Sequence, residues 1–323
     1  MLGFAVLATL VPSLTTAWIS YVENKRSLTA KASEELLSVS AQAVRELELW
    51  TKERRYDLRV FSISYEVTEN LERIPQADGE PVRAGRAHSR LTDYLRSVRE
   101  RFVDYAELFV LDTHGHVVAS SDTAPRPVQL RGDWLTELRM SEWVVGRTYW
   151  DSAAGRPEMI VAVPIRTAGG GALLGALTAR LNLRAVADTL ARFAPGEQGQ
   201  IYLMTPRGGI LVSSRGASEA LMRQRFTVDV AGWLSAREGR AVQFSSFTGE
   251  RVLGSARRAP ALTWVVVAEI PAAEAFREVA RLRNTTLAIV AALLAVVGAL
   301  AYLLSLLIVR PLDRLTQGAA KVA

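Results

Sequence analysis

Two uncharged apolar stretches dominate the hydrophobic pattern of this chain, residues 2–22 and residues 285–309. Each holds about the 20 residues that an α-helix needs to cross a hydrocarbon core of ~30 Å. The segment after the second stretch contains three cations and one acid, and Lys and Arg collect on the cytoplasmic side of membranes. The pattern predicts two transmembrane helices, a cytoplasmic C-terminus, and residues 23–284 outside the cytoplasm.

The first stretch has an alternative interpretation as a cleaved signal peptide. It lacks both a basic n-region and a small-x-small cleavage site. Its outer end carries Trp18 and Tyr21, which suit the aromatic belt at a membrane surface. An uncleaved anchor is therefore the favoured interpretation.

Between the apolar stretches, the first pattern along the chain is helical. Apolar residues recur at steps of three and four from residue 23 to residue 74, without Pro or Gly, and predict one long helix. After a loop at 75–87, further helices are predicted at 88–102, 183–193 and 216–237. Pro271 takes a favoured first-turn position for a last helix that runs into the second apolar stretch.

Alternating and β-rich runs predict two groups of strands. The first group is 106–112, 117–121, 145–151, 158–166 and 172–182, and its first two strands form a hairpin around Gly115. The second group repeats this order at 200–204, 210–214, 240–246, 250–258 and 262–270. The outer region is therefore an α+β structure of two lobes in tandem.

Composition narrows the possible functions. The chain has no Cys, which excludes disulfides and thiolate sites for metals or catalysis. The net charge is +6, of which the segment after Val309 contributes +2 and the apolar stretches none, so +4 is spread over the outer region. No dense basic stripe is present there, and we expect no nucleic-acid partner.

Three segments of the outer region resemble a double Cache sensor domain, a PAS-like extracytoplasmic domain of bacterial transmembrane receptors. They are the hairpin Phe109-Val110-Leu111-Asp112 with Gly115 and Val118-Ala119-Ser120-Ser121, the strand Ile160–Ile165, and the start of the second lobe at Gly199–Leu203. The run Arg310-Pro311-Leu312 with Leu315 resembles the opening of a HAMP linker. Leu312, Leu315, Ala319 and Val322 follow the spacing of a helix-packing seam, with Pro311 at the junction.

The resemblance divides the chain into six parts: transmembrane helix 1–22, stalk helix and loop 23–87, membrane-distal Cache lobe 88–195, membrane-proximal lobe 196–283, transmembrane helix 284–309, and the HAMP start at 310–323. It implies a multi-pass homodimer in the bacterial inner membrane, with a periplasmic domain that binds a small molecule and needs no cofactor. The output would be a sensor histidine kinase, with a chemoreceptor or nucleotide cyclase as alternatives. An anchored enzyme or a tether is the alternative of another class.

Polar side chains on strand 145–151 are the first ligand-binding candidates. Alternation places Arg147, Tyr149 and Asp151 on one face, where three polar groups suit a small polar ligand. The alternative is that these residues pair with one another at the edge of a hairpin.

The resemblance adds three further candidates. Amino-acid-binding members carry an Arg-x-Trp-Tyr segment, then a Tyr, then an Asp on a later strand. Arg131 and Tyr149 fit this pattern, Trp134 replaces the tyrosine, and Arg180 stands at the position of the Asp. Because this exchange removes the group that would hold an ammonium, it implies an anion clamped by Arg131 or Arg180, with Trp134 stacking nearby.

Metal binding and catalysis have little support. His114 and His116 lie across a glycine turn with no third ligand near them in sequence, so we expect no metal site. The chain contains neither a Gly-x-Ser-x-Gly elbow nor a His-Glu-x-x-His motif.

Overall fold

A computed structural model describes residues 2–74, 76–77, 80–81, 85–123, 128, 130, 132–167, 171–226, 232 and 236–304. Two sets of candidates lie outside these residues: Arg131, and the proposed linker seam with Pro311, Leu312, Leu315, Ala319 and Val322. The chain forms two compact units, Glu35–Pro271 and the two terminal segments Met1–Glu34 and Ala272–Ala323.

The long N-terminal helix is α1, Leu2–Ser62, followed by α2, Tyr65–Arg73. The prediction of one uninterrupted helix to residue 74 is wrong at Ser64, which adopts an extended conformation with φ −61° and ψ 139°. Its carbonyl oxygen accepts hydrogen bonds from the amides of Val67 and Thr68, so Ser64 starts a new helix. Serine favours such helix starts over helix interiors because its polar side chain competes for backbone bonds.

Helix α2 is followed by the two-residue strands β1, Gln76–Ala77, and β2, Glu80–Pro81, within the predicted loop. Helix α3, Arg86–Arg101, then leads into the first large sheet. Its strands are β3 Tyr105–Asp112, β4 Val117–Ser120, β5 Val144–Asp151, β6 Arg156–Arg166 and β7 Leu173–Asn182. The order is β4-β3-β7-β6-β5, entirely antiparallel, and all five predicted strands are confirmed. Between β4 and β5 lies α4, Trp134–Met140.

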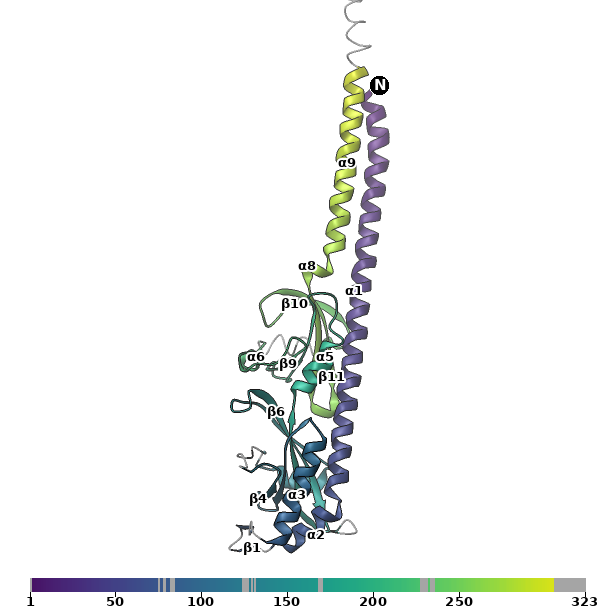
Figure 1. The fold of residues 1–323 in the computed structure, drawn as a ribbon. Coiled ribbons are helices and arrows are strands. Elements are labelled where there is room, and N and C mark those ends of the chain that lie inside the picture. The colour runs from purple at the N-terminus through teal and green to yellow at the C-terminus, as the bar shows by residue number, and fades with distance from the viewer. Residues whose placement is uncertain are drawn as a thin grey trace, which may run out of the picture. The chain divides into compact units, whose positions relative to one another are not determined.

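Helix α5, Arg184–Ala191, joins the first sheet to the second. The second sheet contains β8 Gln200–Met204, β9 Ile210–Ser213, β10 Ala241–Ser245, β11 Arg251–Ala259 and β12 Trp264–Pro271. Its order is β10-β11-β12-β8-β9, with a 3₁₀ turn at Pro260–Leu262 before β12. The predicted α+β class with a long helix and two lobes is therefore confirmed (Figure 1).

The prediction of one continuous helix over 216–237 is wrong, because residues 224–226 are not helical. Helix α6 covers only Glu219–Arg223, and the following residues turn back to the β8–β9 hairpin. The amide of Phe226 donates to the carbonyl oxygen of Gly208 at 2.9 Å, and the Phe226 side chain is buried in the core of the lobe. Burial of this aromatic ring outweighs the helical pattern, because local propensity is only a weak constraint.

The two lobes repeat one hairpin construction. In the first, the Leu108 amide donates to the Ser121 hydroxyl at 2.9 Å, and in the second the Ile201 amide donates to the Ser214 hydroxyl at 3.0 Å. This shared contact aligns β3–β4 with β8–β9 residue by residue.

Helix α1 contacts both lobes from Glu35 onward. In the second lobe, the hydroxyl oxygens of Ser40 and Ser255 lie 3.3 Å apart and are buried. In the first lobe, the Trp50 indole donates to the Asp104 carboxylate at 3.3 Å, and Arg54 pairs with the same carboxylate. The helix therefore connects the two sheets along its length (Figure 1).

Strand β12 continues into α8, Ala272–Ala275, and α9, Arg277–Leu304. Pro271 ends β12, opposite Val252, rather than opening the helix. Among the described residues, one helical segment, Arg277–Leu300, is long and apolar enough to cross a membrane. The predicted first span belongs to α1, and its insertion stays a prediction.

Glycine at position 199 allows the entry to β8 to approach the preceding loop. A Cβ atom there would lie 1.9 Å from the Pro195 carbonyl oxygen and 2.8 Å from Ile270 Cγ2. We expect Gly199→Ala to lower the free energy of unfolding by about 1–3 kcal/mol, because the added methyl group overpacks this site. The measurement is the Tm of the full chain in neutral detergent, which should fall. Gly132→Ala, where no atom lies within 4 Å, is the control. Equal melting temperatures for the two variants would contradict this packing constraint.

Candidate functional site

A polar cluster crosses one face of the first sheet. Glu107 on β3 lies opposite Arg180 on β7, and Tyr149 on β5 lies opposite Glu158 on β6. Ser120 on the edge strand β4 joins them through Glu107. Because alternate residues of a strand share a face, the antiparallel register brings these side chains together from five strands.

Hydrogen bonds make this polar cluster continuous. Arg180 Nε donates to Glu107 Oε2 at 2.7 Å, while its Nη1 donates to the Tyr149 hydroxyl. The Tyr149 hydroxyl donates to Glu158 Oε2 at 3.1 Å. At one end of the network the Ser120 hydroxyl donates to Glu107 at 2.8 Å, and at the other end Arg156 Nε donates to Glu158 at 3.0 Å.

Burial makes the ionic pairing necessary. Arg180 is 2% exposed, and both carboxylates are buried. A buried charge is strongly unfavourable unless it is paired and hydrogen-bonded. Burial opposes the charge of Arg180, but the Tyr149 hydroxyl and the Glu107 carboxylate outweigh this effect and raise the pKa of Arg180. Burial raises the pKa of Tyr149, which therefore stays protonated as a donor.

Thr178 adds an unused polar group to the same face. It lies on β7 opposite Phe109, two residues before Arg180. Its side chain is fully buried, and its hydroxyl has no hydrogen-bond partner in the described part of the chain. Buried polar groups are nearly always paired, and this hydroxyl has hydrogen-bonding capacity that no described residue takes up.

An apolar wall borders the polar cluster. Its buried members are Phe109, Leu111, Leu138, Val144, Ala162 and Ala176. Leu130 and Trp134 pack against them, and the Arg180 guanidinium lies 5.4 Å from the Phe109 ring centroid. A few polar groups beside an apolar and aromatic wall are typical of small-molecule sites.

The structure separates the candidates predicted from sequence. Tyr149 and Arg180 belong to the polar cluster, and Trp134 lies against the adjoining wall. Arg147 lies at a bulge between Val145 and Thr148, and its side chain is exposed; that it shares a face with Tyr149 and Asp151 stays a prediction.

Asp151 has a local structural role. Its carboxylate accepts hydrogen bonds from the amides of Ala153 and Ala154 at 2.9 and 3.1 Å, closing the turn between β5 and β6. An aspartate that bonds to backbone two or three residues ahead stabilises a turn. This contact holds the turn of the β5–β6 hairpin and does not test a pairing of Asp151 with Arg147 or Tyr149.

Three central residues were missed in the sequence analysis: Glu107, Glu158 and Thr178. The two acids stand in otherwise apolar, β-rich runs, Ala106-Glu107-Leu108 and Glu158-Met159-Ile160. A carboxylate in a fully buried strand needs a partner, and this signal could have been used. Thr178 gives no comparable signal, because Thr is common in strands.

The second lobe has a polar cluster at the corresponding positions. The Glu269 carboxylate on β12 accepts hydrogen bonds from Gln200 at 2.8 Å, Tyr202 at 2.8 Å and Ser246 at 2.6 Å. Burial raises the pKa of Glu269, although the three donors oppose this shift. Burial and the nearby carboxylate together raise the pKa of Tyr202.

The histidine turn has a structural explanation. The buried Asp112 carboxylate accepts the backbone amides of His114 and His116 at 2.8 Å each, while both imidazoles are largely exposed. Within the described ranges, no group of three or more His, Cys, Asp or Glu residues could hold a metal ion.

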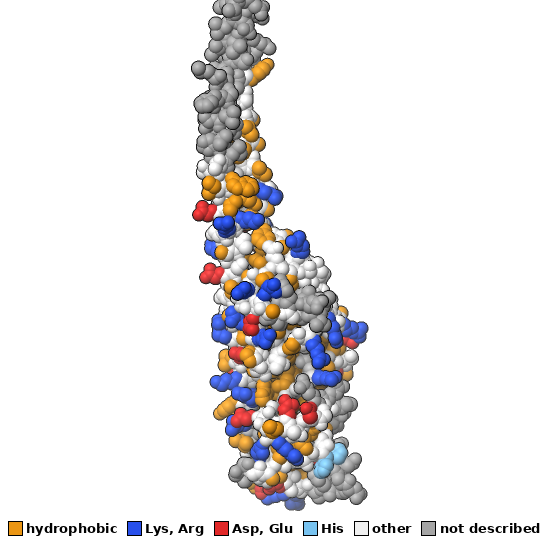
Figure 2. Space-filling view, turned by 180° about the vertical axis from the view of Figure 1, so that it is seen from behind, with side chains coloured by type: hydrophobic (Ala, Val, Ile, Leu, Met, Phe, Trp, Pro, Cys, Tyr) orange, Lys and Arg blue, Asp and Glu red, His pale blue; other side chains and the backbone are white. Residues whose placement is uncertain are grey.

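On the face seen in Figure 2, the described Lys and Arg side chains are dispersed among acidic and apolar ones.

The buried ion pair gives a stability prediction. We expect Arg180→Met to lower the free energy of unfolding by about 3–5 kcal/mol, because it removes the cation paired with the buried Glu107 carboxylate. Arg101→Met, on the exposed end of α3, should change stability by less than about 0.5 kcal/mol. Denaturant unfolding of the full chain in detergent measures both. Similar losses in the two variants would contradict a special role for the pair.

Glu269 gives a prediction of pH dependence. Because its pKa is raised in the folded state, its contribution to stability is present below the unfolded pKa and is lost as pH rises through the folded value. We expect the Tm of the wild type relative to Glu269→Gln to fall as pH rises from mildly acidic to neutral. The matched exposed variant Glu219→Gln should show no such trend, and parallel pH profiles for wild type and Glu269→Gln would disprove the assignment.

The profile of the Cache domain family matches residues 24–279. No curated protein matches the sequence. The ligand-binding domain of the Campylobacter jejuni chemoreceptor Tlp3, in complex with 4-methylisoleucine, is similar with a TM-score of 0.56, 12% identity, and coverage of 77% of this chain and 94% of that domain.

Two further solved structures have the same fold. The ligand-binding domain of the Pseudomonas aeruginosa amino acid chemoreceptor PctC, in complex with GABA, has a TM-score of 0.51 and 14% identity, covering 74% of this chain and 99% of that one. The sensor domain of the Vibrio cholerae histidine kinase DctB has a TM-score of 0.52 and 14% identity, covering 77% and 98%. With a family profile spanning most of its length and the two-lobed fold to match, this chain belongs to the Cache domain family.

Proposed function

We propose that this chain is the input half of a transmembrane receptor that binds a small ligand at the polar cluster of the first lobe. The observation that carries the proposal is that the buried Thr178 hydroxyl, beside Arg180 and the apolar wall, has no hydrogen-bond partner among the described residues. Membership of the Cache family supports a sensory role, because its solved relatives include ligand-binding domains of chemoreceptors and a histidine kinase.

The proposed ligand is a small organic anion. GABA and 4-methylisoleucine, bound by the two chemoreceptors, carry both a carboxylate and an amine. In this chain Glu107 and Glu158 already pair with Arg180 and Arg156, which leaves less negative charge for a ligand ammonium. By sequence, Arg131 lies between Leu130 and Trp134, both of which pack on the site wall, so a carboxylate clamped by Arg131 remains the proposal.

The proposed signal leaves the domain by two connections. Strand β12 runs directly into α8 and α9, and α1 contacts both sheets. A ligand shifts such a structure only through different affinities for two conformations. We propose a multi-pass homodimer in the bacterial inner membrane, with a HAMP linker and a histidine kinase as output; a chemoreceptor or cyclase is the alternative. A tether or an anchored enzyme is less favoured, since the solved relatives are ligand-binding and sensor domains.

The experiment is a thermal-shift screen of the full chain in neutral detergent against small mono- and dicarboxylates, amino acids and amines. Binding to the folded state raises the Tm by mass action. We expect a carboxylate to stabilise the wild type, and Arg131→Gln to weaken its affinity about tenfold or more through loss of a charge-assisted contact.

Arg147→Gln is the matched control, because the Arg147 side chain is exposed and, among the described residues, makes no hydrogen bond or ion pair with the polar cluster. It should leave the affinity unchanged. Stabilisation by amino acids alone would overturn the proposed ligand class. A complete lack of stabilisation across the screen would favour the tether.

A further inference from the structure

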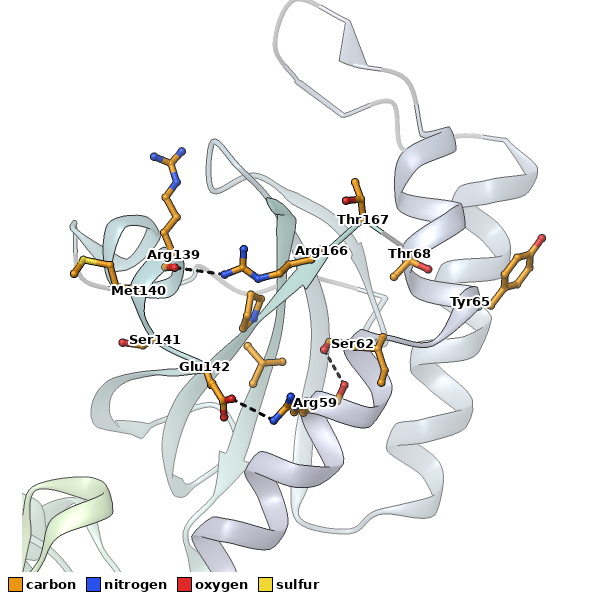
Figure 3. A pocket seen from close by; sticks show the side chains of 13 residues that line it. Arg59, Ser62, Tyr65, Thr68, Arg139, Met140, Ser141, Glu142, Arg166 and Thr167 are labelled. Atoms are coloured by element: carbon orange, nitrogen blue, oxygen red, sulfur yellow. Dashed lines mark hydrogen bonds and ion pairs between the residues drawn. The ribbon is translucent and has the colours of Figure 1, made fainter. Parts of the chain in front are cut away.

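A cleft lies where the break between α1 and α2 meets the end of β6. Its volume is about 630 Å³, and it is lined from α1, α2, α4 and β6 (Figure 3). Strand β5 begins opposite Ala162, so Val163–Arg166 extend beyond it and pair only with β7. The helix break and the uncovered end of β6 together form this cleft.

Positive charge dominates the lining of the cleft. Arg59, Arg139 and Arg166 line it together with one acid, Glu142. Arg59 pairs with Glu142 at 3.3 Å, which leaves two guanidinium groups without a carboxylate partner among the described residues. An anion would therefore find a net charge of +2 there, three cations less one acid.

The hydrogen bonds of the lining residues leave N–H donors on Arg166. Arg166 Nη2 donates to the Arg139 carbonyl oxygen at 3.4 Å, a long contact across the cleft (Figure 3). A guanidinium has five N–H donors, so Arg166 retains most of its capacity. The hydroxyls of Ser62 and Thr68, in contrast, already donate to backbone carbonyls of α1 and Ser64.

The remaining lining is apolar. Val163 and Pro164 line the cleft from β6, and Ile63 and Met140 are 68% and 86% exposed at its borders. Large apolar side chains at this level of exposure, grouped around a cleft, indicate a contact surface for apolar groups. The cleft thus combines the Arg166 guanidinium with an apolar wall, and the exposed Arg139 side chain extends outward at its rim (Figure 3).

We propose that this cleft is a second ligand site, which binds a carboxylate attached to an apolar or aromatic group. The carboxylate would accept a bidentate contact from Arg166, which is the geometry in which a guanidinium binds a carboxylate best. Arg139 would supply a second contact. The apolar part would lie against Ile63, Val163 and Pro164.

Helix α4 would couple this second site to the polar cluster. Arg139 and Met140 at its end line the cleft, while Trp134 and Leu138 pack on the wall of the first site. A ligand that bridges Arg139 on α4 and Arg166 on β6 would hold both elements in one arrangement. This coupling rests on the proposed function of the first site, but binding in the cleft does not.

The test uses benzoate as the probe, with benzamide as its neutral counterpart and acetate as the anion without an apolar group. Binding to the full chain in neutral detergent is measured as a Tm shift at constant ionic strength. We expect benzoate to raise the Tm, with smaller shifts from the other two compounds. Arg166→Gln and Arg139→Gln should each raise the benzoate Kd about tenfold or more.

Arg101→Gln is the matched control, because it removes the same charge from an exposed position on α3 of the same lobe. An equal loss of affinity in Arg101→Gln would reveal a general charge effect and overturn the proposal. So would the absence of any benzoate shift in the wild type. Loss of binding in Tyr149→Phe but not in Arg166→Gln would place benzoate at the polar cluster, supporting the proposed function and overturning the cleft site.

Discussion

The pairing of Arg180 with Glu107 is the constraint on which the first lobe depends. Both side chains are buried, and neither charge is tolerable there alone. The two side chains can contact each other directly only when Glu107 on β3 lies opposite Arg180 on β7. A one-residue slip would send one side chain to the opposite face and leave two unpaired charges. The ionic pair therefore fixes the register at the centre of the sheet and places Tyr149 and Glu158 within reach.

In the second lobe, different residues satisfy the buried polar groups of the corresponding face. Gln200 and Glu269 stand where the first lobe has Glu107 and Arg180. There, three neutral donors satisfy one carboxylate. Val267 lies opposite Tyr202, whereas the unpartnered Thr178 lies opposite Phe109. The buried polar groups of the second lobe thus satisfy one another on this face, whereas the Thr178 hydroxyl of the first lobe has no partner among the described residues.

Local patterns predicted most of the fold because each strand is a β-rich run bounded by turn residues. They failed where a tertiary contact outweighed local preference, as at Phe226, whose buried ring ends the helical pattern. Within the polar cluster, Tyr149 and Arg180 were found from their resemblance to a family pattern. Glu107 stands out in the sequence as an acid in an apolar strand, but its pairing with Arg180 depends on a register between β3 and β7 that the sequence does not state.

Helix α1 limits how the lobes can move against each other. It holds Asp104 of the first lobe through Trp50 and Arg54, and Ser255 of the second through Ser40. Packed helices and interfaces shift between discrete arrangements rather than deform smoothly. A movement of the first sheet must therefore break the contacts at Asp104 or carry α1 along the second sheet. Strand β12 of that sheet continues into α8 and α9, so in the proposed relay a shift of α1 along the second sheet would carry a change at the polar cluster to α9, which is long and apolar enough to cross a membrane.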